Sequence, residues 1–100
     1  MTKGLAISND PMYQLIREGK IEEFNAKKQS GEYCNLKGCD FRSLDLRGID
    51  LRGSLLDGCS IDAAKIFGTY FPLNILAQEI LLSLEHGTRL RVIHEKKQPE

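Results

Sequence analysis

The sequence predicts a mainly β fold: a short solenoid of about two coils, with helical segments covering both ends. One observation is an apolar residue, Leu, Ile or Phe, at every fifth position from Leu36 to Phe71. A period of five fits neither the helical repeat of 3.6 nor the strand repeat of 2. The second observation is that the flanking segments, 10–31 and 74–86, carry apolar residues at helical spacing instead.

The repeat becomes clear when the chain is divided into fives from Cys34: CNLKG, CDFRS, LDLRG, IDLRG, SLLDG, CSIDA, AKIFG and TYFPL. One side chain per unit can be buried if the chain turns a quarter circle in each unit, so that four units close a square coil. Gly occupies the fifth place in five of the eight units and supplies the dihedral freedom for a corner. The predicted core is the set of third-place residues: Leu36, Phe41, Leu46, Leu51, Leu56, Ile61, Ile66 and Phe71.

Successive coils are expected to stack at the spacing of paired strands, about 4.8 Å, so that residue n lies beneath residue n+20. Three outward pairs at this offset carry opposite charges: Lys37 with Asp57, Arg42 with Asp62, and Asp45 with Lys65. Each surface pair stabilises the fold by only about 0–1 kcal/mol. Their value is that they support the register.

The N-terminal segment 10–31 predicts a pair of helices that covers the first coil. Asp10 can accept from free backbone N–H groups, and Pro11 at the first helical position needs no donor. Gly19 ends this helix, and a second helix of about 21–28 ends before Ser30-Gly31. The apolar residues expected to face the coil are Met12, Leu15, Ile16, Ile21 and Phe24.

The segment 74–93 predicts a helix and then a short strand. Asn74 is the expected N-cap of a helix over about 75–86, and Gly87 is the expected stop. Leu76, Ile80 and Leu84 share one helical face, which should cover the second coil. Phe71 and Leu73 should lead into that contact. Residues 88–93 alternate in the manner of a strand, and the polar tail 94–100 should fray. The whole chain, 1–100, is read as one domain.

The run CNLKGCDFRSLDLRGIDLRGSLLDG resembles the pentapeptide-repeat family, whose consensus has a small residue, Asp or Asn, Leu or Phe, and two variable residues. The second place of the first four units matches: Asn35, Asp40, Asp45 and Asp50. The later units depart from it with Leu55, Ser60, Lys65 and Tyr70. The resemblance implies a right-handed quadrilateral β-helix without an active site. Some longer, acidic relatives imitate DNA and inhibit or protect gyrase, a role that needs many coils and an acidic face.

The composition excludes some classes of function. The 14 Lys and Arg residues balance the 14 Asp and Glu residues, whereas a general nucleic-acid binder needs a basic excess to displace phosphate counterions. No run approaches the roughly 20 apolar residues that span a bilayer, and the first residues lack a signal-peptide core. We therefore expect a cytoplasmic protein with reduced thiols, and neither membrane nor nucleic acid as a partner.

Two sets of residues are candidate sites. Cys34, Cys39 and Cys59 all occupy the first place, where Cys serves as a small apolar side chain, and no nearby His completes a zinc site. Arg47 and Arg52 have no charged residue at the offset of twenty and could bind an acidic partner or a phosphate. The alternative for the two arginines is a solvated face, with their stems lying on Phe67.

Catalysis is not expected. Glu85 and His86 lie at a predicted helix end, where His satisfies carbonyl groups and the helix dipole, and no nucleophile stands at a recognisable spacing. We expect no metal and no cofactor. The sequence favours a non-catalytic interaction or scaffold module with an unknown protein partner. A homodimer formed through exposed strand edges, and an inhibitor or regulator of a nucleic-acid enzyme such as gyrase, are the alternatives.

Overall fold

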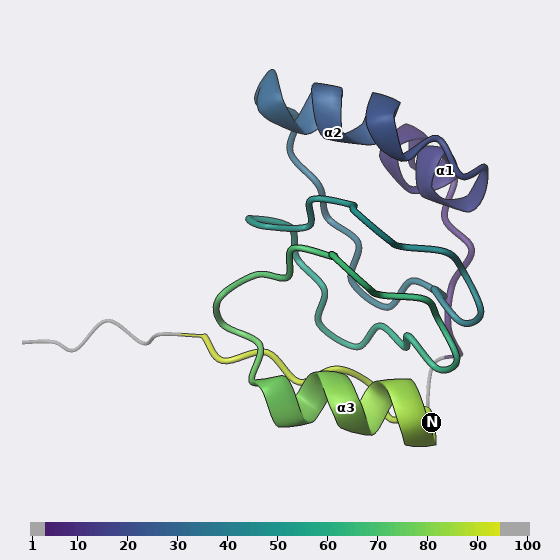
Figure 1. Ribbon diagram of the computed structural model, residues 1–100, viewed down its shortest axis with the longest axis vertical. Coiled ribbons are helices and arrows are strands. Elements are labelled where there is room, and N and C mark those ends of the chain that lie inside the picture. Colours follow the sequence, from purple (N-terminus) through teal and green to yellow (C-terminus); the bar gives the residue numbers. More distant parts are fainter. Residues whose placement is uncertain (1–3, 95–100) are drawn as a thin grey trace, which may run out of the picture.

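The computed structural model describes residues 4–94 of the chain. Stacked turns of residues 34–73 lie between helices at two ends (Figure 1). Helices α1 (Pro11–Arg17) and α2 (Ile21–Gln29) lie at one end, and α3 (Ala77–His86) lies at the other. Helical segments were predicted at these places. Most of the tail predicted to fray, residues 95–100, falls outside the described residues.

Parallel bridges set the register between the two turns. Four bridges each join a second-place residue to the residue twenty positions later: Asn35 to Leu55, Asp40 to Ser60, Asp45 to Lys65, and Asp50 to Tyr70. Because a unit is five residues long, an offset of twenty means four units per turn. The predicted register is confirmed. The pairing consists of isolated bridges, and no extended strand forms within residues 4–94.

Backbone hydrogen bonds connect the turns at each unit. The N–H of a third-place residue in the first turn donates to the carbonyl of a second-place residue in the next. Leu46 donates to Lys65 at 2.8 Å, and Leu51 donates to Tyr70 at 2.8 Å. The polar backbone of the first turn is thereby satisfied at the level where its side chains are buried.

The interior is formed by third-place and first-place side chains. Six of the eight predicted core residues are at most 2% exposed: Leu36, Phe41, Leu46, Leu51, Leu56 and Ile61. The last two, Ile66 and Phe71, are only partly buried, because Ser83, Leu84 and Leu90 hold the C-terminal segment against residues 58–63, earlier in the same turn. The three cysteines are buried free thiols, and Cys59 Sγ donates to the Leu36 carbonyl at 2.8 Å.

The corners use left-handed backbone. The fifth-place residue has a φ between 60° and 79° in seven of the eight units, including the non-glycine residues Ser43 and Ala63. A side chain in this region costs about 1–2 kcal/mol, which explains why Gly predominates there. Leu73 is the exception, with no positive φ. The chain leaves the coil at this residue.

The first helix packs through an aromatic residue that the sequence analysis did not single out. Asp10 caps α1 as predicted, accepting from the Met12 N–H at 2.8 Å. Tyr13 is fully buried, and its hydroxyl donates to the Asp40 carbonyl at 2.6 Å. Its ring meets Phe41 edge to face, with centroids 5.5 Å apart. Tyr13 therefore joins α1 to both the backbone and the core of the first turn.

Two residues from outside the coil make hydrogen bonds to the backbone at the outer edge of the first turn. Asn25 of α2 donates from Nδ2 to the Gly48 carbonyl at 3.0 Å and accepts at Oδ1 from the Asp50 N–H at 2.9 Å. The side-chain amide thus makes the two bonds that another backbone strand would make. Ala6 does the same with its backbone, since it bonds both Gly38 and Asp40.

At the C-terminal end three expectations need correction. Helix α3 begins at Ala77 with Leu76 as N-cap and no side-chain cap bond, so Asn74 is not the cap. Leu76 is 46% exposed and Leu73 is 100% exposed, so neither covers the coil. Residues 88–93 form no strand, because their pairing with the coil is confined to Leu90, which exchanges bonds with Gly58 and Cys59. The predicted stop at Gly87 is confirmed by its φ of 74°.

The face of α3 that meets the second turn is partly polar. Ser83 is buried, and its Oγ accepts from the Ile61 N–H at 3.1 Å. Glu79 is 6% exposed and binds Arg91 through Nε at 2.9 Å. The carbonyl of Leu84 accepts from the Ala63 N–H. The bonds of Ser83 and Leu84 hold α3 against the coil, whereas Glu79 joins α3 to the C-terminal segment at Arg91.

Replacing Leu46 by Ala should lower the free energy of unfolding by about 2–5 kcal/mol, because the side chain is fully buried and its removal leaves a cavity. Urea denaturation followed by circular dichroism measures the change. Leu81→Ala is the control, since Leu81 is 53% exposed and should change stability by less than about 0.5 kcal/mol. Equal effects of the two substitutions would contradict this assignment of the core.

Replacing Asn25 by Ala should lower the free energy of unfolding by about 1–3 kcal/mol, because the Asp50 N–H and the Gly48 carbonyl lose their partner. Hydrogen exchange of the Asp50 amide should accelerate. Asn25→Asp keeps an acceptor for Asp50 but no donor for Gly48, so its effect should be intermediate. Unchanged Asp50 exchange in Asn25→Ala would rule out the capping role.

Candidate functional site

The outward surface of the first turn carries three internal ion pairs. In each of three successive units the second-place Asp binds the fourth-place Arg through two bonds, from Nε to Oδ1 and from Nη2 to Oδ2. The pairs are Asp40–Arg42, Asp45–Arg47 and Asp50–Arg52. The same Oδ1 accepts from the backbone N–H of the arginine. The arginine hydrogen bonds hold the pKa of each aspartate below its usual range.

These pairs correct two expectations from the sequence. The three predicted cross-turn pairs attract each other electrostatically across the turns, but none forms a direct ion pair in the part of the chain that the structure describes. Arg47 and Arg52 also do not lack a charged partner, because the nearest carboxylate lies two residues earlier within the unit. An Asp-x-Arg spacing on an extended segment places both side chains on one side. The prediction compared only residues twenty positions apart and therefore did not consider this pairing.

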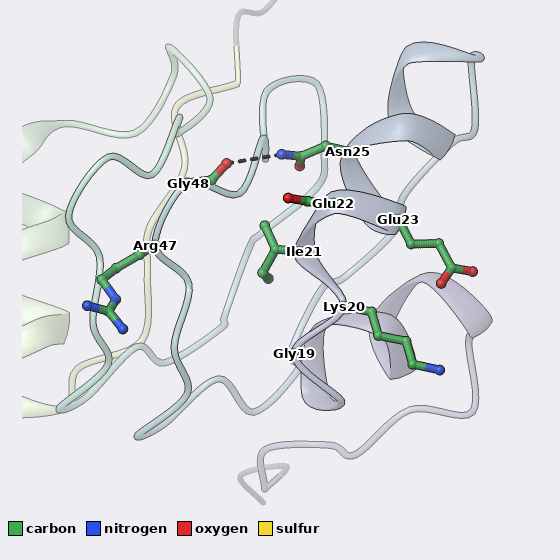
Figure 2. A pocket seen from close by; sticks show the side chains of 8 residues that line it. All are labelled: Gly19, Lys20, Ile21, Glu22, Glu23, Asn25, Arg47 and Gly48. Atoms are coloured by element: carbon green, nitrogen blue, oxygen red, sulfur yellow. Dashed lines mark hydrogen bonds between the residues drawn. The ribbon is translucent and has the colours of Figure 1, made fainter.

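Arg47 and Arg52 occupy different surroundings. The Arg52 guanidinium lies 4.9 Å from the centroid of the Tyr70 ring, where the cation is attracted to the ring face. Arg47 has a 54% exposed side chain and lies at the edge of the groove drawn in Figure 2, pointing away from α2. Each charge is neutralised within its own unit, so the two arginines form a weaker anion site than their spacing predicts.

The groove in Figure 2 lies between the start of α2 and the third unit of the first turn. Its volume is about 640 Å³, and its lining residues are Gly19, Lys20, Ile21, Glu22, Glu23, Asn25, Arg47 and Gly48. Ile21 points into the groove, whereas Lys20 and Glu23 point away (Figure 2). The bond from Asn25 to Gly48 crosses between its two walls. This groove is the seam where α2 joins the coil.

A second, more apolar groove lies where the chain leaves the coil. We call it the Leu73 groove; it has a volume of about 380 Å³ and is lined by Arg52, Gly53, Ser54, Leu55, Pro72, Leu73 and Asn74. Four large exposed apolar side chains belong to the same stretch of chain, residues 67–76. They are Phe67 at 87%, Tyr70 at 55%, Leu73 at 100% and Leu76 at 46% exposure, and together we call them the apolar patch.

The apolar patch was not predicted, although the sequence contains a signal for it. In the first turn the outward second, fourth and fifth places carry mostly Asp, Arg and Gly. In the last two units Phe67 occupies a fourth place, Tyr70 a second place and Leu73 a fifth place. An outward place filled by a large apolar residue is informative, because the coil does not bury it.

The other candidate residues are distributed over the molecule. Glu85 and His86 are exposed at the end of α3. His94 pairs with Asp57 and thereby holds residues beyond Leu90 against the second turn. Burial raises the pKa of Cys59 to about 12, so this thiol is inert at neutral pH. Among the described residues no group of three or more His, Cys, Asp or Glu is placed to hold a metal ion.

Comparison with known proteins agrees with the period of five residues. Residues 34–71 match the family model for pentapeptide repeats, in eight copies. Residues 34–71 are therefore a run of pentapeptide repeats. No curated protein and no solved structure matches it. Among the described residues, every helix is too short or too polar to cross a membrane.

Acid should destabilise the fold through the three aspartates. Their pKa values are lowered in the folded state, so their contribution is complete above the ordinary Asp pKa of about 3.9 and is lost as the pH falls through the lowered values. The thermal midpoint should therefore fall as the pH is lowered from about 5 to about 2.

The matched variant for this experiment is Asp40→Asn/Asp45→Asn/Asp50→Asn. Asn35 already accepts from the Lys37 N–H at 3.2 Å in the first unit, so Asn keeps the turn and removes only the charge. The variant should have a lower thermal midpoint at neutral pH and a shallower acid dependence. An acid dependence as steep as that of the wild type would assign the effect to other carboxyl groups.

Proposed function

We propose that this protein is a non-catalytic protein-interaction module that binds its partner through the apolar patch. In this proposal the repeat segment is a short right-handed quadrilateral β-helix, which the bridges at an offset of twenty support. The observation that carries the proposal is the exposure of Phe67 and Leu73, at 87% and 100%, on a segment otherwise held by backbone pairing. Several large exposed apolar side chains within one short segment commonly mark an interaction site.

The fold itself does not require the apolar patch. The buried interior is made by third-place and first-place residues together with the helices, and outward places in the first turn are filled by charged residues. A polar side chain at Phe67 would satisfy the coil equally well. The cost of exposing large apolar groups to water is therefore best explained by a partner that covers them.

The alternative, an inhibitor or regulator of a nucleic-acid enzyme such as gyrase, has less support. It would need a free acidic face, and the carboxylates of Asp40, Asp45 and Asp50 are each engaged by an arginine. Pairing within the unit leaves little net negative potential on the first turn. The interaction module is therefore the function that we propose.

The test is affinity capture from an extract of the cells that make the protein, with wild type, Phe67→Ser/Tyr70→Ser and Leu81→Ser as bait. The first variant removes two aromatic members of the apolar patch, and the second changes an exposed leucine outside it. We expect specific partners, which include further copies of the chain, to be lost only with the first variant. Identical capture by all three baits would refute the proposal.

A further inference from the structure

Leu73 is anomalous for its place in the repeat. Seven of the eight fifth-place residues are Gly, Ser or Ala at a positive φ, whereas Leu73 has a large side chain and no positive φ. Its side chain is completely exposed. The corner geometry does not demand Leu here, and the core does not receive it. The residue is therefore available for a contact outside the chain.

The Leu73 groove lies directly beside this side chain. Leu73 is itself one of the lining residues, together with Leu55 and Pro72, which give the groove an apolar wall. The volume of about 380 Å³ is large enough for a leucine side chain. A projecting apolar side chain next to an apolar groove is self-complementary, because a two-fold axis between them would place each Leu73 in the groove of the other copy.

The charges around the groove favour the same partner. In a two-fold contact each charge near the axis meets its own copy, so unpaired charges are repulsive. The apolar patch contains no charged residue. Arg52 is the one charged residue that lines the groove, and it is already bound to Asp50 and lies over the Tyr70 ring. Like-charge repulsion across the axis is thereby minimised.

The geometry points to a second copy of this chain as the occupant: two copies associate about a two-fold axis, with Leu73 of each seated in the Leu73 groove of the other. This inference rests on the proposed function and names its partner. Two aromatic side chains, each able to bury roughly 150–250 Å², and two leucines form a contact smaller than the roughly 800 Å² per partner of a standard interface. The dimer is therefore a weak, concentration-dependent one.

Sedimentation equilibrium on the full chain, from about 10 μM to about 1 mM, measures the association. Leu73→Asn should raise the dissociation constant roughly tenfold or more, because each substitution removes two buried leucines from the dimer. Leu81→Asn is the matched control and should leave the constant unchanged. Since Leu73 is fully exposed in the monomer, both variants should retain the wild-type circular dichroism spectrum.

A second measurement locates the contact. The three native thiols are buried, and burial raises the pKa of each, so a nitroxide reagent should label Asn74→Cys, which lines the groove beside an intact Leu73, selectively at the new thiol. Mixing this labelled copy with ¹⁵N-labelled wild type should broaden the amide signals of Gly53 and Leu55 in the wild-type copy. Broadening confined to α1 and α2, or no broadening at concentrations where dimer is present, would overturn the proposed geometry.

The outcomes also separate this inference from the proposed function. A wild-type chain that stays monomeric at about 1 mM overturns self-association. If affinity capture in that case still yields a partner that is lost in Phe67→Ser/Tyr70→Ser, the interaction module stands and its partner is a different protein. A dimer that survives Leu73→Asn unchanged overturns the reciprocal insertion of Leu73.

Discussion

The structure depends on the burial of one large apolar side chain in every five residues, together with a hydrogen bond to the turn above at the same level. Leu46 shows both halves of this constraint: its side chain is fully buried, and its N–H donates to Lys65 twenty residues later. Since inward places are occupied by apolar residues, polar chemistry is confined to the outward places. Everything that distinguishes one face from another therefore lies in the second, fourth and fifth places.

Two turns provide only one interior contact between coils and leave two outer edges, so the ends determine whether so short a solenoid can exist. At the first edge Asn25 and Ala6 supply hydrogen bonds that a further coil would otherwise make to the backbone of the first turn. At the second edge the closure is uneven. The carbonyl of Leu84, Ser83 Oγ and Leu90 serve residues 58–63, while the following units carry the apolar patch. The hydrogen bonds that cap the second turn and the exposed side chains of the apolar patch thus lie on different parts of the same edge.

The period of five was sufficient to predict the register, the core and the left-handed corners, because each depends on a residue type at one place of the repeat. The caps could not be predicted in the same way. Asn25 and Tyr13 act through contacts with residues more than twenty positions away, and no local pattern encodes such contacts. The Arg47 and Arg52 site was misjudged because the offset of twenty was given priority over the spacing of two. The residues of the repeat that belong to the apolar patch can be read from the sequence, but they occupy outward places, which do not contribute to the core.

The four-unit turn also restricts how the chain can change in length. Each cap recognises particular faces of the coil: Asn25 meets the corner at Gly48, and Leu90 meets Gly58 and Cys59. Inserting one pentapeptide between these points would rotate one cap by a quarter turn relative to the other. Inserting four would preserve every face. Length variation compatible with both caps therefore proceeds in steps of twenty residues, a whole coil at a time.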